Sequence, residues 1–196
     1  MKRKIFWLTV ITTACYILFL SIFDDWEYDE AWSYGGANHS SIIDLIKYSK
    51  FNTANNHIIN SLYFKLLQNN GITNVFFFRF LSIIGFALFL YSQIKLFKLL
   101  NIKYAYIIVL LITPYIQYFA LARGYGLAVG CIGMSLYFLF NFISTDKNSN
   151  VVLMVLFGVL ASFSVYSFLF GFLGIYSAYL IYNRTKIFTP TNFSLL

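Results

Sequence analysis

The chain has 196 residues, of which 60% are hydrophobic and 11% are charged, and its mean hydropathy is +0.72. A soluble domain needs far more polar surface, so this composition excludes a water-soluble globular protein and indicates an integral membrane protein. The net charge of +7 does not indicate nucleic-acid binding, because the basic residues form small groups at the ends of apolar runs, where they set membrane topology. No nucleic-acid partner is therefore expected.

Long apolar runs follow one another along most of the chain. They are continuous and do not alternate apolar with polar residues, which favours membrane-spanning helices over a β-barrel. A helix needs about 20 residues to cross the hydrocarbon core. We therefore expect an all-α fold, a polytopic membrane helix bundle that forms a single transmembrane domain over residues 1–196. Six spans are predicted, at residues 5–23, 73–94, 104–120, 125–143, 151–166 and 168–183.

The last two predicted spans come from one apolar stretch, residues 151–182, which is too long for a single upright crossing. Gly171, Gly174 and the serines at 162, 164 and 167 offer places where a helix can break. Two spans, one strongly tilted helix, and a span followed by a re-entrant piece are all compatible with this stretch.

The charges predict the orientation of the chain. If the N terminus lies in the cytoplasm, most of the 14 basic residues fall into cytoplasmic segments, as the positive-inside rule requires. Every acidic residue except Asp146 falls into the first outer loop, residues 24–72. We expect a multi-pass protein of the plasma (cytoplasmic) membrane whose acidic first loop lies outside.

This first outer loop carries strong helix signals. Ser41 and Asp44 have the spacing of a capping box. Further along, apolar residues repeat at helical spacing, at Ile59, Leu62, Tyr63, Leu66 and Leu67. His57, Asn60 and Phe64 fall on another face of the same segment. Amphipathic helices lying in the membrane interface, with their apolar side toward the lipid, are therefore expected between residues 24 and 72.

Asp29 and Glu30 are the first candidates for chemistry. Adjacent residues on a helix point about 100° apart, so the two carboxylates cannot face one atom in the same way. Either one contacts a substrate while the other binds an ion or holds its neighbour, or both belong to a solvated acidic loop. A carboxylate in the first role suits a general base that takes a proton from a hydroxyl.

The other candidates are polar residues near the predicted membrane surface. His57 and Asn60 fit a polyhydroxy ligand, and they fit an ordinary wet surface equally well. Arg79 lies inside the second predicted span and is expected to extend outward to the headgroups. Arg123 follows the third predicted span on the outer side, where a guanidinium binds either a ligand phosphate or ordinary lipid phosphates.

In chain order, the motifs "YDEAWS", "NHIINSLYFKLL", "FFFRFLSIIG" and "YFALARGYGLA" resemble the N-terminal half of the GT-C type membrane glycosyltransferases. The closest subgroups are the protein-mannosyltransferase-like and the lipid A aminoarabinose-transferase-like enzymes. The resemblance covers roughly residues 1–180. Because members of that family are longer, it implies that this chain corresponds to the N-terminal part of a longer GT-C fold.

The resemblance implies transfer of a sugar from a polyprenyl-phosphate monosaccharide to an extracytoplasmic acceptor, with inversion at the anomeric carbon. Asp29 and Glu30 occupy the place of the family's catalytic acidic pair. His57 and Asn60 stand in a His-Pro-Pro-Leu-like motif that here lacks both prolines. Arg123 and Tyr125 stand in an Arg-Pro-Tyr-like motif near the donor phosphate. Members with a divalent metal carry an acid just before the histidine, where this chain has Asn56, so a possible metal stays unassigned.

Expected partners are therefore the lipid-linked donor, membrane lipids, and a glycan, lipid or protein acceptor. The alternative is a non-catalytic, truncated membrane protein that binds polyprenyl lipid or accompanies another membrane enzyme. A transporter is disfavoured because the sequence shows no internal repeat. The transferase hypothesis requires Asp29, His57 and Arg123 to line one outward cavity, with carboxylate and guanidinium within about 12 Å, a span set by the size of ligand cavities.

Overall fold

The computed structural model describes residues 2–50, 57–102 and 113–187, and all regular secondary structure in these residues is α-helix. The all-α expectation is thereby confirmed. The helices are α1 (Lys2–Phe23), α2 (Tyr28–His39), α3 (Ile42–Lys47), α4 (Ile58–Asn69), α5 (Val75–Leu99), α7 (Thr113–Ala120), α8 (Tyr125–Thr145), α9 (Asn148–Ser164) and α10 (Phe168–Ile187).

Within the described residues, three helices are long and apolar enough to cross a membrane: α1, α5 and α8. They correspond to the predicted spans 5–23, 73–94 and 125–143. Helix α9 is apolar but shorter. The predicted span 104–120 lies largely outside the described residues, and only its last part appears as α7. Six membrane spans therefore stay a prediction.

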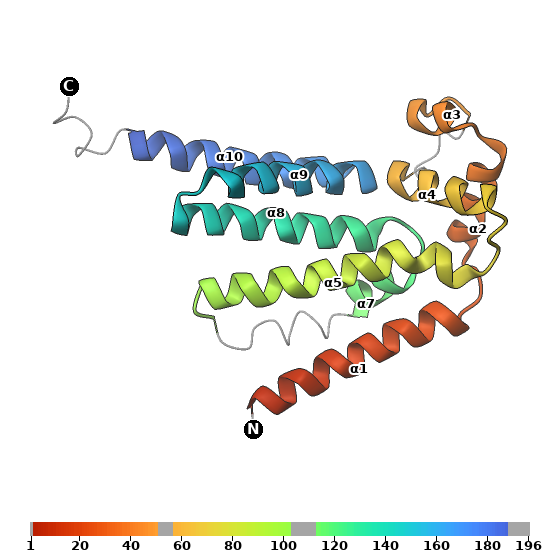
Figure 1. Cartoon of the computed structure of the whole chain (residues 1–196), viewed down its shortest axis with the longest axis horizontal. Coiled ribbons are helices and arrows are strands. Elements are labelled where there is room, and N and C mark those ends of the chain that lie inside the picture. The colour runs from red at the N-terminus through yellow and green to blue at the C-terminus, as the bar shows by residue number, and fades with distance from the viewer. Residues whose placement is uncertain (1, 51–56, 103–112, 188–196) are drawn as a thin grey trace.

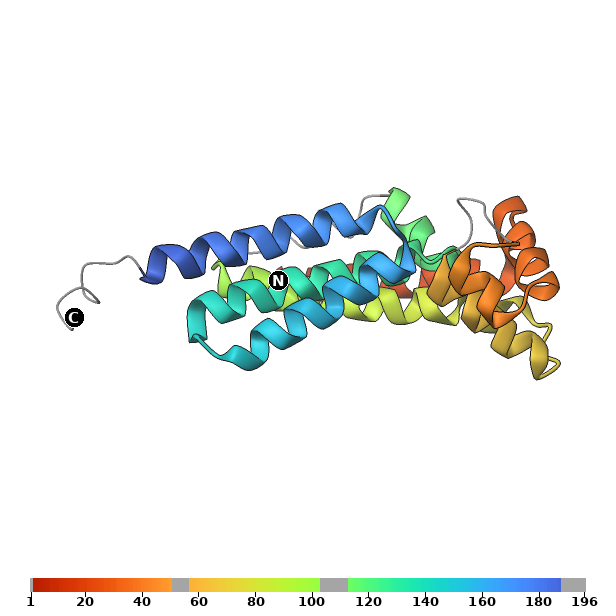
Figure 2. The same cartoon turned by 90° about the horizontal axis from the view of Figure 1, so that it is seen from above.

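The stretch from residue 151 to residue 182 forms two helices. Helix α9 ends at Ser164 and α10 begins at Phe168, and the two run in opposite directions and diverge from their short connection (Figures 1 and 2). The possibility of one long tilted helix is therefore wrong. The break follows Ser162 and Ser164, and the backbone N–H of Val165 still bonds to the carbonyl of Ala161, which closes the last turn of α9.

The bundle is held most closely between α5 and α8. A Cβ atom built on Gly85 would lie 2.2 Å from the carbonyl oxygen of Gly126, and one on Gly130 would lie 2.3 Å from the carbonyl oxygen of Gly85. The two backbones are therefore in direct contact, as is common where small residues line the interface between membrane helices.

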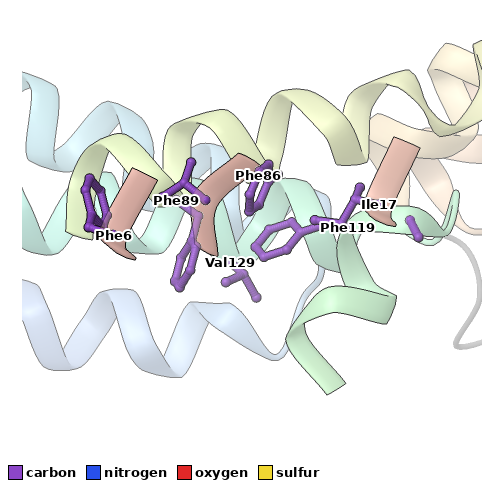
Figure 3. Packing of buried hydrophobic residues seen from close by; sticks show 8 residues of the cluster. Phe6, Ile17, Phe86, Phe89, Phe119 and Val129 are labelled. Carbon is purple, nitrogen blue, oxygen red and sulfur yellow. The ribbon is translucent and has the colours of Figure 1, made fainter. Parts of the chain in front are cut away.

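A cluster of buried apolar side chains joins α1 to this pair. Phe6 and Ile17 come from α1, Phe86 and Phe89 from α5, and Phe119 from α7. In Figure 3 the ring of Phe119 lies between Ile17 and Phe86. The ring centroids of Phe119 and Phe86 are 5.3 Å apart. Because the cluster also includes Val129 of α8 and so spans four helices, it fixes the position of α1 at the edge of the bundle.

Helices α1 and α9 finish at one end of the bundle, which we call the loop end, and α5, α8 and α10 begin there (Figure 1). Helices α2, α3 and α4 lie together beyond it (Figures 1 and 2). The predicted capping box is present, since Ser41 and Asp44 bond reciprocally at the start of α3. On α4, the face with His57, Asn60 and Phe64 is buried, whereas Leu66 is 58% exposed.

Candidate functional site

A buried ion pair between Glu30 and Arg79 lies at the loop end. Both side chains have no exposed surface. The Nε of Arg79 donates to Oε1 of Glu30 at 3.0 Å, and its Nη2 donates to Oε2 at 2.6 Å. The expectation that Arg79 extends outward to the headgroups is therefore wrong. A buried charge is costly unless it is paired and fully hydrogen-bonded, and this geometry provides both conditions.

Arg79 also completes the end of α1. Its Nη1 donates to the carbonyl oxygens of Leu20 and Asp24, at 3.0 Å each, and its Nη2 donates to that of Asp25 at 2.8 Å. The last carbonyls of a helix have no partner within the helix. Arg79 therefore holds the start of α5 against the end of α1 and the connection to α2.

Glu30 joins two further backbone segments. Its Oε2 accepts a hydrogen bond from the N–H of Glu27 at 3.0 Å, which completes the capping box of α2. Its Oε1 accepts one from the N–H of Ala122 at 2.5 Å. Each oxygen of this carboxylate thus has two donors within the protein. Of the adjacent acids Asp29 and Glu30, Glu30 is therefore the one that joins neighbouring segments of the chain.

Asp29 lies on a different face of α2 and pairs with Arg123. The Nη2 of Arg123 donates to Oδ2 of Asp29, and its Nη1 lies 3.8 Å from a carboxylate oxygen of Glu27. The side chains of Asp29 and Arg123 are 33% and 26% exposed. The required approach of carboxylate and guanidinium is met, because the two groups are in contact. Unlike Glu30 and Arg79, this pair is open to solvent or to a ligand.

The turn before α8 places Arg123. Its neighbour Ala122 is held from both sides, since its N–H bonds to Glu30 and its carbonyl accepts from Nδ2 of Asn60 at 2.7 Å. Gly124 has φ +73°, and a Cβ there would lie 2.9 Å from the carbonyl oxygen of Ser164 and 3.0 Å from Cβ of His57. Only glycine adopts this backbone without strain and without a clash. The turn is therefore rigid, and it directs Arg123 toward α2.

His57 and Tyr125 lie behind this turn. The imidazole is 6% exposed, and its ring meets that of Tyr125 edge to face with centroids 5.0 Å apart. Burial lowers the pKa of His57 to about 4, so the side chain is neutral at pH 7. The Tyr125 ring also stacks on Tyr118, and the guanidinium carbon of Arg123 lies 5.9 Å from its centroid. A cation near an aromatic face is attracted to it.

Asn60 is 2% exposed, and its amide contacts the backbone of the turn rather than open solvent. Among the described residues, its Oδ1 and the hydroxyl of Ser61 have no hydrogen-bond partner. Asn60 therefore positions the Arg123 turn in this structure. No group of three or more His, Cys, Asp or Glu side chains suited to a metal ion occurs in the described part of the chain.

A small cavity of about 110 Å³ lies between the end of α1 and α7. Its walls include Asp24 and Glu27 together with Leu20 and Gln117. Asp29, His57 and Arg123 do not line it. The structure thus gathers the predicted residues around one turn, but this cavity is not the shared chamber that we expected.

Two features of this region were missed in the sequence. The buried partner of Glu30 is Arg79, and the signal was present, since an arginine inside a span requires a counter-charge. The hydrogen bond from the N–H of Ala122 to Glu30 could not be predicted from the sequence, because every residue type except proline carries this backbone group.

No family model, no curated protein and no solved structure matches this chain.

Proposed function

We propose that the chain is a membrane glycosyltransferase of the GT-C type that moves a sugar from a polyprenyl-phosphate monosaccharide to an extracytoplasmic acceptor. The observation that carries the proposal is the contact between Asp29 and Arg123. It brings a partly exposed carboxylate and a partly exposed guanidinium together where the first loop meets the turn before α8. Those are the two charges that such a transfer needs.

In the proposed reaction, the carboxylate of Asp29 takes the proton of the acceptor hydroxyl. The hydroxyl oxygen then forms a bond to the anomeric carbon on the side opposite the phosphate. The bond between that carbon and the phosphate oxygen breaks, and polyprenyl phosphate leaves. Arg123 stabilises the negative charge of the leaving phosphate. Attack from the opposite side inverts the anomeric centre.

The direct ion pair gives this scheme an order of events. A donor phosphate entering the site competes with Asp29 for the Arg123 guanidinium, which forms bidentate bonds with phosphate as readily as with carboxylate. Once Arg123 has changed partner, Asp29 is released to act as a base. Glu30 is committed to Arg79 and to two backbone N–H groups, so we assign it a structural role and leave the catalytic role to Asp29.

The same proposal includes six membrane spans in the plasma membrane, with a cytoplasmic N terminus and with α2, α3 and α4 outside. The distribution of charge supports this orientation. The acidic residues of segment 24–44 lie at the loop end, whereas Lys95 and Lys98 lie near the opposite end of α5. Lys147 lies in the connection between α8 and α9, which is also at the opposite end (Figure 1).

The test compares Asp29→Asn with Asp25→Asn in membrane vesicles that contain the full chain. Both variants remove one negative charge, but the side chain of Asp25 is exposed, and only its carbonyl contacts Arg79. Mass spectrometry of lipids that copurify with the wild-type chain first identifies the donor. Transfer of its labelled sugar should be lost in Asp29→Asn and kept in Asp25→Asn. Full-rate transfer by Asp29→Asn would refute the catalytic assignment.

One observation favours a second function, a non-catalytic protein that binds polyprenyl lipid. Asp29 and Arg123 already neutralise each other, so the pair is stable without any reaction. This function predicts a copurifying polyprenyl lipid that both variants retain. It also predicts no sugar transfer by the wild-type chain.

A further inference from the structure

A cavity of about 430 Å³ lies on α2, on a part of the loop end that the proposed reaction does not use. Its volume is within the range of about 300–1,000 Å³ that is usual for small-molecule sites. The lining residues are Ala31, Trp32, Gly35, Gly36 and His39 of α2, then Ser40, and Lys50 beyond α3.

The cavity opens on the side of α2 that does not face the protein core. Glu30, Ser33 and Ala37 form the buried face of this helix. At about 100° per residue, positions 31, 32, 35 and 39 fall on the opposite face. Among the described helices, α2 makes its main contacts with α4 through its buried face, so the cavity does not lie inside that helix–helix contact.

Gly35 leaves one side of the cavity open. Glycine is the least favourable residue in a helix interior apart from proline. A Cβ built on Gly35 would meet no atom within 4 Å, and its backbone does not have the positive φ that requires glycine. Neither packing nor backbone conformation explains the residue. What its missing side chain does provide is an open floor for the cavity.

The walls of the cavity have a definite chemistry. Trp32 is 49% exposed. The ring of Tyr28 stacks on its indole, with ring centroids 6.2 Å apart and an angle of 22° between the ring planes. This gives a fixed, flat apolar wall. His39, Ser40 and Lys50 supply hydrogen-bond donors around it. The apolar C–H face of a sugar ring fits such a wall, while its polar substituents reach the donors.

The charges on the walls favour a negatively charged ring. None of the described residues that line the cavity is acidic. The nearest carboxylate, Asp44, lies 3.4 Å from Nζ of Lys50 and is also held by the hydroxyls of Ser41 and Ser49. These hydrogen bonds lower the pKa of Asp44, so it stays ionised, and they hold its carboxylate at Ser41 and Ser49. The Lys50 side chain is 68% exposed and is therefore able to turn to a ligand anion.

We propose that this cavity binds a sugar ring that carries a carboxylate or phosphate group, and that this sugar belongs to the acceptor. The assignment to the acceptor rests on the proposed transferase function, whereas the binding itself does not. Trp32 lies three residues after Asp29 on α2, an axial rise of about 4.5 Å. A sugar stacked on Trp32 therefore places its neighbouring groups close to the proposed base.

The test measures binding to the full chain in lipid nanodiscs by isothermal titration calorimetry. The probes are glucuronate, glucose 6-phosphate, glucose and inorganic phosphate. We expect the two anionic sugars to bind at least tenfold more tightly than glucose or phosphate alone. Gly35→Leu fills the cavity and should weaken their binding at least tenfold without lowering Tm. Gly174→Leu is the matched control, because a Cβ at Gly174 on α10 also meets nothing within 4 Å.

Two further variants test separately the apolar wall and the charged wall of the cavity. Trp32→Ala should weaken all three sugars, and Lys50→Gln should remove only the preference for the anionic ones. The proposal is wrong if the anionic sugars bind no better than phosphate, or if Gly35→Leu binds them as the wild type does. Binding is measured without any sugar transfer. A failed transfer assay therefore refutes the transferase function and the assignment of the sugar to the acceptor, but it does not refute sugar binding in the cavity.

Discussion

Removal of the Arg79 side chain should be the most destabilising single change in the loop end. Arg79→Ala leaves the Glu30 carboxylate fully buried without its counter-charge. It also removes the Arg79 donor from the carbonyls of Leu20, Asp24 and Asp25, although that of Leu20 keeps a backbone donor, the N–H of Asp24. Helix α1 would then lose its polar attachment to α5.

The expected cost follows from the burial of the pair. Breaking a fully buried ion pair by removing one partner costs about 3–5 kcal/mol. For a domain of this length, each 1 kcal/mol lowers Tm by about 2–4 °C, so Tm should fall by roughly 10 °C. A double variant, Arg79→Met with Glu30→Met, should cost less than the two single changes together, because no charge is left unpaired. The coupling between the two residues should reach about 2 kcal/mol.

The measurement is thermal unfolding of the purified chain in one detergent, for the wild type, both single variants and the double variant. Lys95→Ala is the control, because it removes an exposed cation from the same helix. Its cost should stay within about 0.5 kcal/mol. If Arg79→Ala costs no more than the control, or if the two single changes simply add, the buried pair does not hold this end together.

Other consequences of the structure can be tested in the same preparation. The pKa of His57 is about 4 when folded, against an ordinary value of 6.5, so the unfolded chain takes up the proton first on acidification. Stability should therefore be complete above about pH 6.5 and fall by up to about 3 kcal/mol as the pH drops to 4, and His57→Gln should lack this component. Gly124→Ala should cost at least about 1 kcal/mol in a denaturation assay, because of its φ of +73° and its close contact with Ser164. Gly85→Val should destabilise the α5–α8 contact by about 1–3 kcal/mol or more, whereas Gly35→Ala, at a site with open space, should raise Tm. In a chain with Cys15 and Cys131 replaced, a membrane-impermeant maleimide added to intact cells should label a cysteine at position 25 and spare one at position 147, and the reverse pattern would invert the topology.

The helices could be predicted from the sequence because their signals are local. Three long apolar runs gave the spans that appear as α1, α5 and α8. The reciprocal bonds of Ser41 and Asp44 depend on a spacing of three residues and could be read directly. The break between α9 and α10 was left open, since polar residues permit a turn there but do not require it.

The arrangement of the site depends on residues far apart in the chain. Glu30 and Arg79 are 49 positions apart, and Glu30 and Ala122 are 92 apart. The sequence placed Asp29 and Arg123 on the same side of the membrane, and the structure brings them into contact. It also places His57 and Asn60 on the buried face of α4, because both pack against the turn that carries Arg123. Hydropathy alone could not distinguish that face from a wetted one.

The buried pair has a consequence for how the protein is made. Glu30 leaves the ribosome before Arg79, so in the proposed topology its carboxylate has crossed the membrane before the arginine of α5 is inserted. An unpaired arginine within a membrane helix is energetically costly. Because Glu30 is synthesised first, Arg79 can form its ion pair as soon as α5 is inserted. Ala122 is synthesised last of the three, and it docks onto a carboxylate that is already fixed. The loop end can therefore assemble from the N terminus onward, with each new segment completing the hydrogen bonds of the one before it.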